Sequence, residues 1–352
     1  MPDQRTVLFL YTRLPDYFYS CVQHFVATYP CKAVIVRYKG DKDTNYTFAP
    51  DENIQLFYKD DLDIPVFIQE LQPSAIVVTG WSDRIYTEAT KKYVRRIPVV
   101  VTVDNPWQGI LRQKVLATLA PWAIHGFANH AWVPGWSQYE YVRRLGFPRD
   151  KILRSMYCAD TEKFYKTQPD GVDFKVDNYP KTIVYAGRLV EYKQPHVLAK
   201  VFNEMAEAGN SPWKLILAGE GPLKKTIAEQ KYSHVEILDF LNPAMLPEFY
   251  QRSGIFCLPS KDEHWGVAVH EAVAAGLPVL LSDTVESASA FLINGYNGLS
   301  FRTSDDSSLK HSLRFLMNMS AVELVRMGNN SVGLSKSINH AIWSATLYNV
   351  LN

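Results

Sequence analysis

The sequence predicts an α/β fold with two doubly wound domains, each a parallel sheet covered by helices. Two observations support this prediction. Short apolar runs alternate with longer amphipathic segments almost from one end of the chain to the other, which is the pattern of βα units. A chain of 352 residues, 47% of them hydrophobic, is also long enough to build two packed cores.

The elements of the first half follow from apolar runs such as VVVTV at 99–103, which is rich in β-branched residues. We expect amphipathic helices between such runs at 86–95, 110–119 and 137–145. The predicted strands are 6–11, 33–38, 75–79, 99–103 and 131–133.

The second half repeats the alternation of apolar runs and amphipathic segments. It follows a polar segment, 166–180 (KTQPDGVDFKVDNYP), whose two prolines and glycine indicate a surface linker. We therefore expect a first domain at 1–165 and a second at 181–335. A terminal helix at 336–352, with Trp343 on its apolar face, is expected to dock on the protein. The predicted strands of the second domain are 182–186, 214–218, 235–238, 255–258 and 279–282.

Composition excludes several classes of protein. The 37 basic and 36 acidic residues leave a net charge of +1, so no broad basic field indicates a nucleic-acid partner. The longest apolar runs fall far short of the roughly 20 residues that cross a bilayer. The start does not resemble a signal peptide, and the four cysteines form no CxxC pair. We expect reduced cysteines and a cytoplasmic protein.

The segment 260–276 (SKDEHWGVAVHEAVAAG) is the richest in chemical information. A helix should begin after Gly266, and its first amides, unpaired and at the positive end of the dipole, form an anion site. Glu263 precedes this helix, and Glu271 lies within its otherwise apolar sequence. A buried carboxylate needs hydrogen-bond donors, such as sugar hydroxyls. The alternative is that Glu271 is a satisfied core acid and Glu263 an ordinary loop charge.

Two cations follow the first strand of the second half, in YAGRLVEYK. Arg188 and Lys193 should lie at the carboxyl end of that strand, where open α/β sheets bind ligands. A guanidinium fork and an ammonium point charge together suit a diphosphate. A solvated pair of charges at a helix start is the alternative interpretation.

These motifs, in the order YAGRLxxxK, LAGEGP, LPSxxExxGxxxxEAxAxGxPV and INGYNG, resemble the donor half of retaining glycosyltransferases of family 4. The resemblance is strong over residues 181–301. It is weaker in the first half, through WVPGWSQYEYVRRLGF and YCADTEKF. It implies the GT-B fold, in which two Rossmann-like domains face a central cleft and the C-terminal helix crosses back to the first domain.

The resemblance implies a retaining hexosyltransferase that moves a sugar from a UDP- or GDP-linked donor to a hydroxyl acceptor, in glycan, polysaccharide or glycolipid assembly. A sugar-nucleotide epimerase or hydrolase of the same fold is one alternative, and a non-catalytic nucleotide-sugar-binding subunit is another. The intact set of Arg188, Lys193, Glu263 and Glu271 argues against the second alternative.

The resemblance also assigns roles to residues. Arg188 and Lys193 would hold the diphosphate and stabilise its charge as the sugar departs. Glu271 would accept the ribose hydroxyls, and Glu263 would face the hydroxyls of the donor sugar. The remaining donor-side positions are the amides of Gly266 and Val267 on the distal phosphate or sugar, Gly219 and Gly221 near the nucleotide, and Phe240 and Leu241 beside the base.

The first half departs from the family, and it should bind the acceptor. The first loop reads YTRLP, which places Arg13 where relatives often have a glycine pair. TVDNPW places Asp104 where many relatives have a histidine, so Asp104 is the candidate polar group facing the reacting sugar; an Asx turn or helix cap is equally compatible. Trp107 and His125 are further acceptor-side candidates, although His125 also fits a core position. Ala290 replaces a common glutamate, so the donor sugar stays open.

No metal site or cofactor is expected. The DxD pairs Asp41/Asp43 and Asp61/Asp63 lie in polar loops far in sequence from the predicted phosphate site, and the two cations can neutralise the leaving group without a metal.

We expect peripheral membrane contact through the first domain, since aromatic and basic side chains gather there. Buried tryptophans and solvated helix faces explain the same residues equally well. The residues are Trp107, Trp122, Trp132 and Trp136, with Arg112, Lys114, Arg143 and Arg144.

Overall fold

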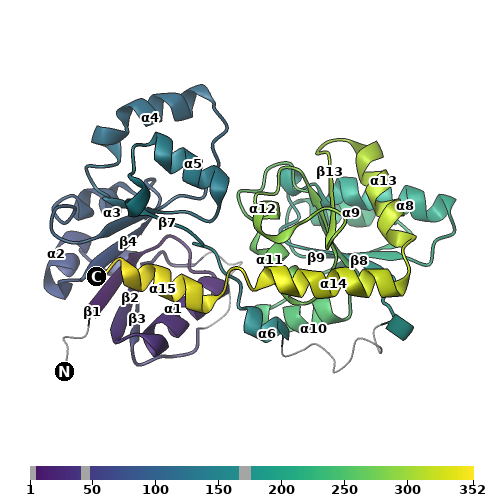
Figure 1. Ribbon diagram of the computed structural model, residues 1–352, viewed down its shortest axis with the longest axis horizontal. Coiled ribbons are helices and arrows are strands. Elements are labelled where there is room, and N and C mark those ends of the chain that lie inside the picture. The colour runs from purple at the N-terminus through teal and green to yellow at the C-terminus, as the bar shows by residue number, and fades with distance from the viewer. Residues whose placement is uncertain (1–4, 41–47, 166–175) are drawn as a thin grey trace. The chain divides into compact units, whose positions relative to one another are not determined.

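The computed structural model describes residues 5–40, 48–165 and 176–352 and divides into two compact units (Figure 1). One unit runs to Cys158 and resumes at Ile338–Asn352, and the other is Ala159–Ser337. Residues 166–175 of the expected linker lie outside the described residues. The second unit thus begins before residue 165, because Phe164 packs on Tyr250 with ring centroids 5.9 Å apart and the Tyr165 hydroxyl bonds Ser335.

The first unit is built on a seven-stranded sheet in the order β3-β2-β1-β4-β5-β6-β7, with every pair parallel. Its central strands are mostly buried and consist largely of valine, isoleucine and leucine, as expected for a parallel sheet covered on both faces. The strands are β1 Arg5–Leu10, β2 Cys31–Arg37, β3 Ile54–Tyr58, β4 Ala75–Thr79, β5 Val99–Thr102, β6 His130–Trp132 and β7 Ile152–Leu153.

Except between β2 and β3, helices within the described residues connect consecutive strands of this sheet. The expected helix 86–95 is shorter, because the Thr90 hydroxyl bonds the Thr87 carbonyl and turns follow. The helices of the first unit are α1 Asp16–Thr28, α2 Ile64–Leu71, α3 Arg84–Thr90, α4 Leu111–Ala123, α5 Trp136–Arg144 and α15 His340–Asn349, with 3₁₀ turns η1 Lys59–Asp61 and η2 Arg149–Lys151.

The second unit is built on a six-stranded parallel sheet in the order β10-β9-β8-β11-β12-β13. All five strands expected here are confirmed: β8 Thr182–Ala186, β9 Lys214–Ala218, β10 Val235–Leu238, β11 Ile255–Leu258 and β12 Val279–Ser282, which β13 Gly298–Phe301 joins. The helices are α6 Thr161–Tyr165, α8 Pro195–Ala208, α9 Leu223–Glu229, α10 Leu246–Gln251, α11 Val267–Ala274, α12 Ala288–Phe291, α13 Asp306–Met317 and α14 Ala321–Ser335, with 3₁₀ turns η3 Glu191–Lys193 and η4 Pro243–Met245.

The sequence analysis missed three strands, and all three lie at or beside a sheet edge. β3 buries only Ile54, β7 has two residues, and β13 begins with a glycine. A Cβ at Gly298 would lie 1.9 Å from the Val279 carbonyl oxygen, so the close approach of these strands requires glycine. Short, half-exposed strands carry little of the apolar pattern by which strands are recognised.

The C-terminal helix α15 belongs to the first unit, as expected, and Trp343 anchors it (Figure 1). The Trp343 ring is fully buried, with ring centroids 5.6 Å from Phe18 and 4.8 Å from Trp132. Its indole nitrogen donates to the Met156 carbonyl at 2.9 Å. A large ring that is both packed and hydrogen-bonded gives the helix one definite docking position.

His270 ties the two ends of the second unit to α11. Its Nδ1 accepts the Ala159 amide proton at 3.1 Å, and its Nε2 lies 3.0 Å from the Ser335 carbonyl oxygen. Since Nδ1 must accept and Nε2 must donate, the buried ring is neutral with its proton on Nε2. The ring also stacks on Phe291, with centroids 4.3 Å apart.

Within the described part of the chain, no helix has both the length and the apolar character needed to span a bilayer.

Replacing Trp343 with alanine should destabilise the first unit by about 3–5 kcal/mol, because the change leaves a cavity and an unpaired carbonyl. Hydrogen–deuterium exchange in increasing urea should show earlier loss of amide protection in α1 and α15. Ile342→Ala is the matched control, since Ile342 is 38% exposed on the same helix. Equal protection in the two variants would contradict the anchoring role of Trp343.

Candidate active site

The candidate donor site lies where the order of the second sheet reverses. Strands β9 and β10 lie on one side of β8, and β11, β12 and β13 lie on the other. The loops that follow β8 and β11 therefore diverge to opposite faces of the sheet, at the kind of position where open α/β sheets bind ligands. Arg188 and Lys193 follow β8, whereas Glu263 and Gly266 follow β11.

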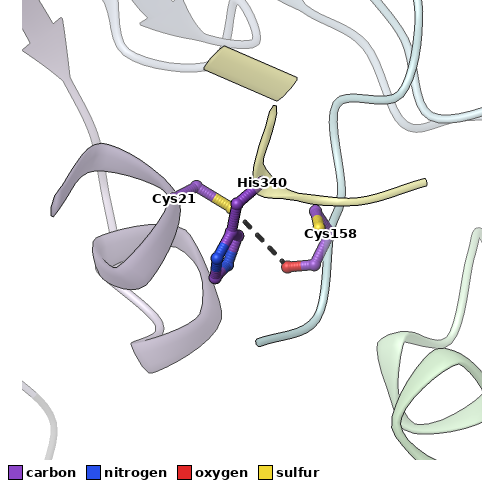
Figure 2. A group of neighbouring side chains, drawn as sticks. All are labelled: Cys21, Cys158 and His340. Carbon is purple, nitrogen blue, oxygen red and sulfur yellow. Dashed lines mark hydrogen bonds between the residues drawn. The ribbon is translucent and has the colours of Figure 1, made fainter. Parts of the chain in front are cut away.

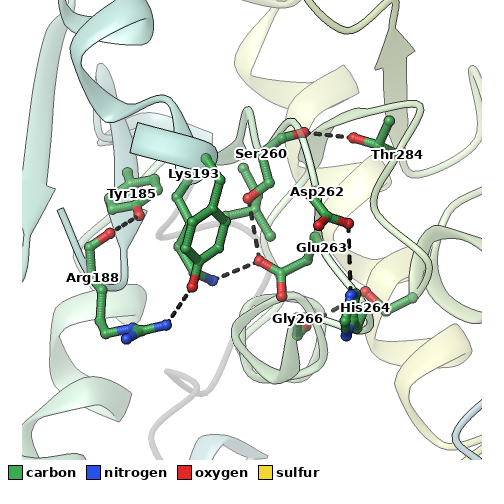
Figure 3. A network of polar contacts seen from close by, with 12 residues as sticks. Tyr185, Arg188, Lys193, Ser260, Asp262, Glu263, His264, Gly266 and Thr284 are labelled. Atoms are coloured by element: carbon green, nitrogen blue, oxygen red, sulfur yellow. Dashed lines mark hydrogen bonds and ion pairs between the residues drawn. The ribbon is translucent and has the colours of Figure 1, made fainter. Parts of the chain in front are cut away.

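An ion pair joins the two loops. Lys193 Nζ lies 2.6 Å from Glu263 Oε2, and the side chains are 17% and 12% exposed (Figure 3). The Ser260 hydroxyl donates to the same carboxylate oxygen at 3.2 Å, and the Lys261 amide donates to the Tyr192 carbonyl at 2.7 Å. The structure thus brings together two residues that are 70 positions apart and holds them by side-chain and backbone bonds.

The end of β11 is fixed by hydroxyl groups from the next strand. The carbonyl of Ser260 accepts hydrogen bonds from Ser282 Oγ at 2.5 Å and from Thr284 Oγ1 at 2.6 Å (Figure 3). The turn that carries Glu263 is therefore part of a connected polar network rather than a free loop.

Arg188 remains exposed beside the ion pair, and its guanidinium donates to the Tyr192 hydroxyl (Figure 3). The buried Tyr185 hydroxyl donates to the Arg188 carbonyl at 2.7 Å, which fixes the backbone of this turn. Burial, together with the charge of Glu263, raises the pKa of Tyr185, so its hydroxyl stays protonated and remains a donor. The cation is thus held on a rigid turn with its charge toward solvent.

Helix α11 begins beside Glu263, as predicted. Gly266 precedes the helix with φ of +87°, a conformation that favours glycine, and no side chain caps the helix. A Cβ at Gly266 would lie 3.1 Å from Glu263 Cγ and 3.2 Å from Leu258 Cδ2. The first amides of α11, including that of Val267, have no partners within the helix and lie next to the Lys193–Glu263 pair. The positive helix end and two cations therefore share one edge of the sheet.

Glu271 lies further along α11, close to the buried Tyr250 of α10. Burial and the negative charge of Glu271 raise the pKa of Tyr250 well above its ordinary value. The half-buried carboxylate of Glu271 thus lies near a phenol that stays protonated.

Gly219 and Gly221 of the GEGP turn, which are predicted to lie near the nucleotide, also have a structural role. A Cβ at Gly219 would lie 1.9 Å from the Gly187 carbonyl oxygen, and one at Gly221 would lie 2.4 Å from that of Leu189. The Leu189 amide donates to the Glu220 carbonyl at 2.7 Å. The turn after β9 therefore packs directly on the loop that carries Arg188.

Phe240 and Leu241 follow β10 at the same edge of the sheet. Phe240 is 52% exposed and Leu241 is half-buried, so their side chains are accessible for stacking or packing.

In the first unit, Asp104 follows β5 and accepts a hydrogen bond from the Tyr157 hydroxyl at 3.1 Å. Burial, with the charges of neighbouring groups that include Asp104, raises the pKa of Tyr157 well above its ordinary value. Asp104 does not cap the next helix, because α4 begins after Ile110. The cap interpretation is wrong, and the aspartate is oriented instead by a half-buried phenol.

The other acceptor-side candidates differ in their surroundings. Arg13 is exposed in the loop after β1. Trp107 packs on Tyr141, with ring centroids 5.6 Å apart, and the Arg144 guanidinium lies 4.8 Å from its ring centroid. Both residues follow strands of the first sheet at its carboxyl edge.

His125 has a structural environment. Its Nε2 lies 2.7 Å from the Leu145 carbonyl oxygen, and its ring lies 4.5 Å from that of Phe147. These contacts join the end of α4 to the end of α5 and favour the core interpretation of this histidine.

The acidic pairs do not form a described metal site. Asp41 and Asp43 lie outside the described residues. Asp61 pairs with Lys39 at 2.8 Å, and the side chain of Asp63 caps α2 by accepting the Val66 amide. Asp61 and Asp63 thus have structural partners of their own.

A cavity of about 610 Å³ opens at the opposite, amino-terminal edge of the second sheet, near Lys181 and Trp213. None of the predicted donor-site residues lines it.

Sequence reasoning missed three residues that organise these sites: Tyr192, Ser260 and Tyr157. All three stand inside quoted motifs, namely YAGRLVEYK, LPSxxE and YCADTEKF. The motifs located the loops, but the partner of each side chain depends on the fold.

Comparison with known proteins agrees with this geometry. Residues 172–332 match the family model described as "Glycosyl transferases group 1". A crystal structure of the Anabaena protein Alr3699/HepE in complex with UDP and glucose superposes with a TM-score of 0.72, covering 99% of each chain at 13% identity. The fold is GT-B. The predicted fold class is thereby confirmed.

Relatives in sequence match only part of this GT-B chain. An uncharacterized glycosyltransferase of Methanocaldococcus jannaschii is 30% identical over 112 residues, which are 30% of this chain and 28% of the relative. An alpha-monoglucosyldiacylglycerol synthase of Acholeplasma laidlawii is 26% identical over 253 residues, 63% of this chain and 61% of the relative. In both cases the match spans less than two thirds of the relative's length.

Proposed function

We propose that the protein is a retaining hexosyltransferase that moves a sugar from a nucleoside diphosphate sugar to a hydroxyl acceptor. The observation that carries this proposal is the convergence of Arg188, Lys193 and the start of α11 at the reversal point of the second sheet. Their positive charge suits a diphosphate leaving group. The family match over 172–332 and the complexes of the Anabaena neighbour with UDP and glucose and with UDP-glucose support the same conclusion.

In the proposed reaction, the bond between the anomeric carbon and the donor's β-phosphate oxygen breaks, and the acceptor hydroxyl attacks the same face of the sugar. The leaving diphosphate takes the acceptor proton, so no protein nucleophile is required. Arg188 and Lys193 stabilise the charge that develops on the phosphate oxygens. Retention of configuration follows from attack on the face from which the diphosphate leaves.

The ion pair suggests how the site holds its donor. Without ligand, Glu263 neutralises Lys193. A bound diphosphate would take over Lys193 as its counter-ion, and Glu263 would then accept hydrogen bonds from the sugar hydroxyls. Glu271 would accept those of the ribose. The Anabaena neighbour, crystallised with UDP and glucose, supports a uridine-linked donor, although GDP fits the same phosphate site.

The acceptor side is proposed to include Asp104, oriented by Tyr157, together with Arg13 and Trp107 of the same sheet edge. Glycan, polysaccharide and glycolipid assembly all use acceptors with free hydroxyl groups. The A. laidlawii relative, whose name describes a glycolipid product, supports the last of these classes.

We further propose that α4 rests on an anionic lipid surface. Leu111, Val115, Leu119 and Trp122 form an exposed apolar face at helical spacing, and Leu111 and Trp122 are both 77% exposed. The exposed Arg112 and Lys114 flank this face on either side. An apolar stripe bordered by cations suits the boundary between headgroups and acyl chains.

The structure corrects the set of tryptophans expected at a membrane. Trp132 is fully buried against Trp343 and cannot contact lipid. Trp122 and Trp136 are exposed, and Arg154 lies over the Trp136 ring at 4.7 Å. The membrane contact is therefore proposed for α4 and its neighbourhood alone.

Lys193→Ala should lower turnover by about 10²- to 10³-fold, because the leaving diphosphate loses one of its charge partners. The variant should also lose the thermal stabilisation that UDP or GDP gives the wild-type protein. Lys200→Ala, at an exposed position on the helix that follows, is the matched control. Near-wild-type turnover of Lys193→Ala would contradict the assignment. Release of free sugar or epimer from donor without acceptor would identify a hydrolase or epimerase instead.

Catalysis should not require a divalent metal at the phosphate site, because Arg188 and Lys193 supply the charge that a metal supplies elsewhere. Adding Mg²⁺ or Mn²⁺ to chelator-treated enzyme should leave turnover unchanged, as measured by product formation. A rise in turnover when either ion is added would contradict this proposal.

Replacing both Leu119 and Trp122 with glutamate should lower binding to phosphatidylglycerol-containing vesicles by at least about tenfold, since two apolar contacts are lost and two negative charges are added. Co-sedimentation measures the effect. Val322→Glu, 62% exposed on α14 of the other unit, is the control. Equal binding by all three proteins, or none by the wild type, would contradict the lipid contact.

A further inference from the structure

A cluster of two thiols and an imidazole lies inside the first unit, outside the sites described above. The potential ligand atoms of Cys21, Cys158 and His340 all lie within 4.8 Å of one another (Figure 2). Cys21 lies on α1, Cys158 lies at the end of the long first segment of the unit, and His340 is the first residue of α15. More than 300 residues of sequence separate the first member from the last, so no local motif predicts the cluster.

We infer that this cluster is a zinc site. Zinc bonds to thiolate sulfur at about 2.3 Å and to imidazole nitrogen at about 2.0 Å, which places tetrahedral ligand atoms about 3.5 Å apart. The ligand atoms of the cluster all lie within 4.8 Å of one another. Side-chain rotations and small shifts of this size would bring the three groups into coordination. Two thiolates and an imidazole are ligands that zinc prefers over magnesium or calcium, and water completes the fourth position.

Charge balance favours zinc in these surroundings. Both cysteines are buried and the histidine is half-buried. Binding releases one proton from each thiol, so that two thiolates neutralise the dication and no net charge is left in the interior. The Cys21 thiol donates to the Cys158 carbonyl oxygen, 3.7 Å from the sulfur (Figure 2).

A neighbouring hydroxyl orients the imidazole. Ser20 Oγ lies 3.2 Å from His340 Nε2, and the His340 ring also lies 5.6 Å from that of His24. Hydrogen bonds of this kind hold the rings of metal-ligating histidines in position.

The position of the cluster determines which segments of the chain a bound ion would hold. Cys158 is the last residue before the second unit begins, and His340 follows closely where the first unit resumes at Ile338. Zinc would therefore link α1 to the two places where the chain passes between the units. Cys158 also follows Tyr157, which donates to Asp104, so the ion would immobilise the segment that orients this proposed acceptor-side group.

The test is metal content and cobalt spectroscopy of the full chain. Wild-type protein purified with zinc should retain one equivalent by mass spectrometry, and Co²⁺ should give a thiolate-to-metal charge-transfer band. Cys21→Ser, Cys158→Ser and His340→Ala should each weaken zinc affinity by at least about tenfold. Cys31→Ser is the matched control, because Cys31 is also buried but lies outside the cluster.

Circular dichroism separates loss of metal from loss of fold in each variant. Wild-type protein with no cobalt band, or with zinc affinity equal to that of a folded Cys21→Ser variant, would overturn the proposal. Recovery of a Cys21–Cys158 disulfide without metal, detected by alkylation and mass spectrometry, would also overturn it in favour of a redox pair. These readouts need no substrate, so their outcome is independent of the proposed transferase activity.

Discussion

The contact between Lys193 and Glu263 is the interaction on which the candidate donor site of the second unit depends. Both side chains are largely withdrawn from water, so each needs the other's charge. Their loops follow different strands, β8 and β11, and the pair holds these loops at a fixed separation. Ser260 and Gly266 both accommodate the Glu263 carboxylate. The Ser260 hydroxyl donates a hydrogen bond to it, and Gly266 has no side chain that would crowd it.

Close backbone packing supports this edge from beneath. The glycines after β9 allow the chain to pass against the loop that carries Arg188, at distances that no side chain would permit. The exposed guanidinium, the ion pair and the free amides of α11 are thereby presented by rigid backbone. Rigid presentation matters for a phosphate site, because charge stabilisation depends on donors that need no rearrangement when charge develops.

Much of this architecture can be predicted from the sequence. Buried parallel strands are continuous apolar runs, and the order in which motifs follow strands locates Arg188, Lys193, Glu263 and Gly266 at one edge. Edge strands such as β3 were missed because most of their side chains face water. The partners Tyr157 and Tyr192 were missed because hydrogen bonds between distant residues are set by packing, which leaves no periodic signal.

The same limit applies to the cysteines. Cys21 and Cys158 are scattered in sequence and carry no metal-binding spacing, yet the return of the chain at Ile338 brings His340 to them. Conversely, His125 stands alone in sequence and is predicted as an acceptor-side residue, while its carbonyl and ring contacts favour a packing role. For such residues, tertiary neighbours decide the function.

The anchoring of Trp343 against Phe18 and Trp132 has a consequence for biosynthesis. The amino-terminal end leaves the ribosome first, but the hydrophobic centre of that unit lacks the Trp343 ring until residue 343 has emerged. The second unit, Ala159–Ser337, is fully synthesised earlier and can fold before the first unit is complete. A nascent chain stalled shortly before residue 338 would thus expose aromatic surface at α1 and β6 for chaperones to cover.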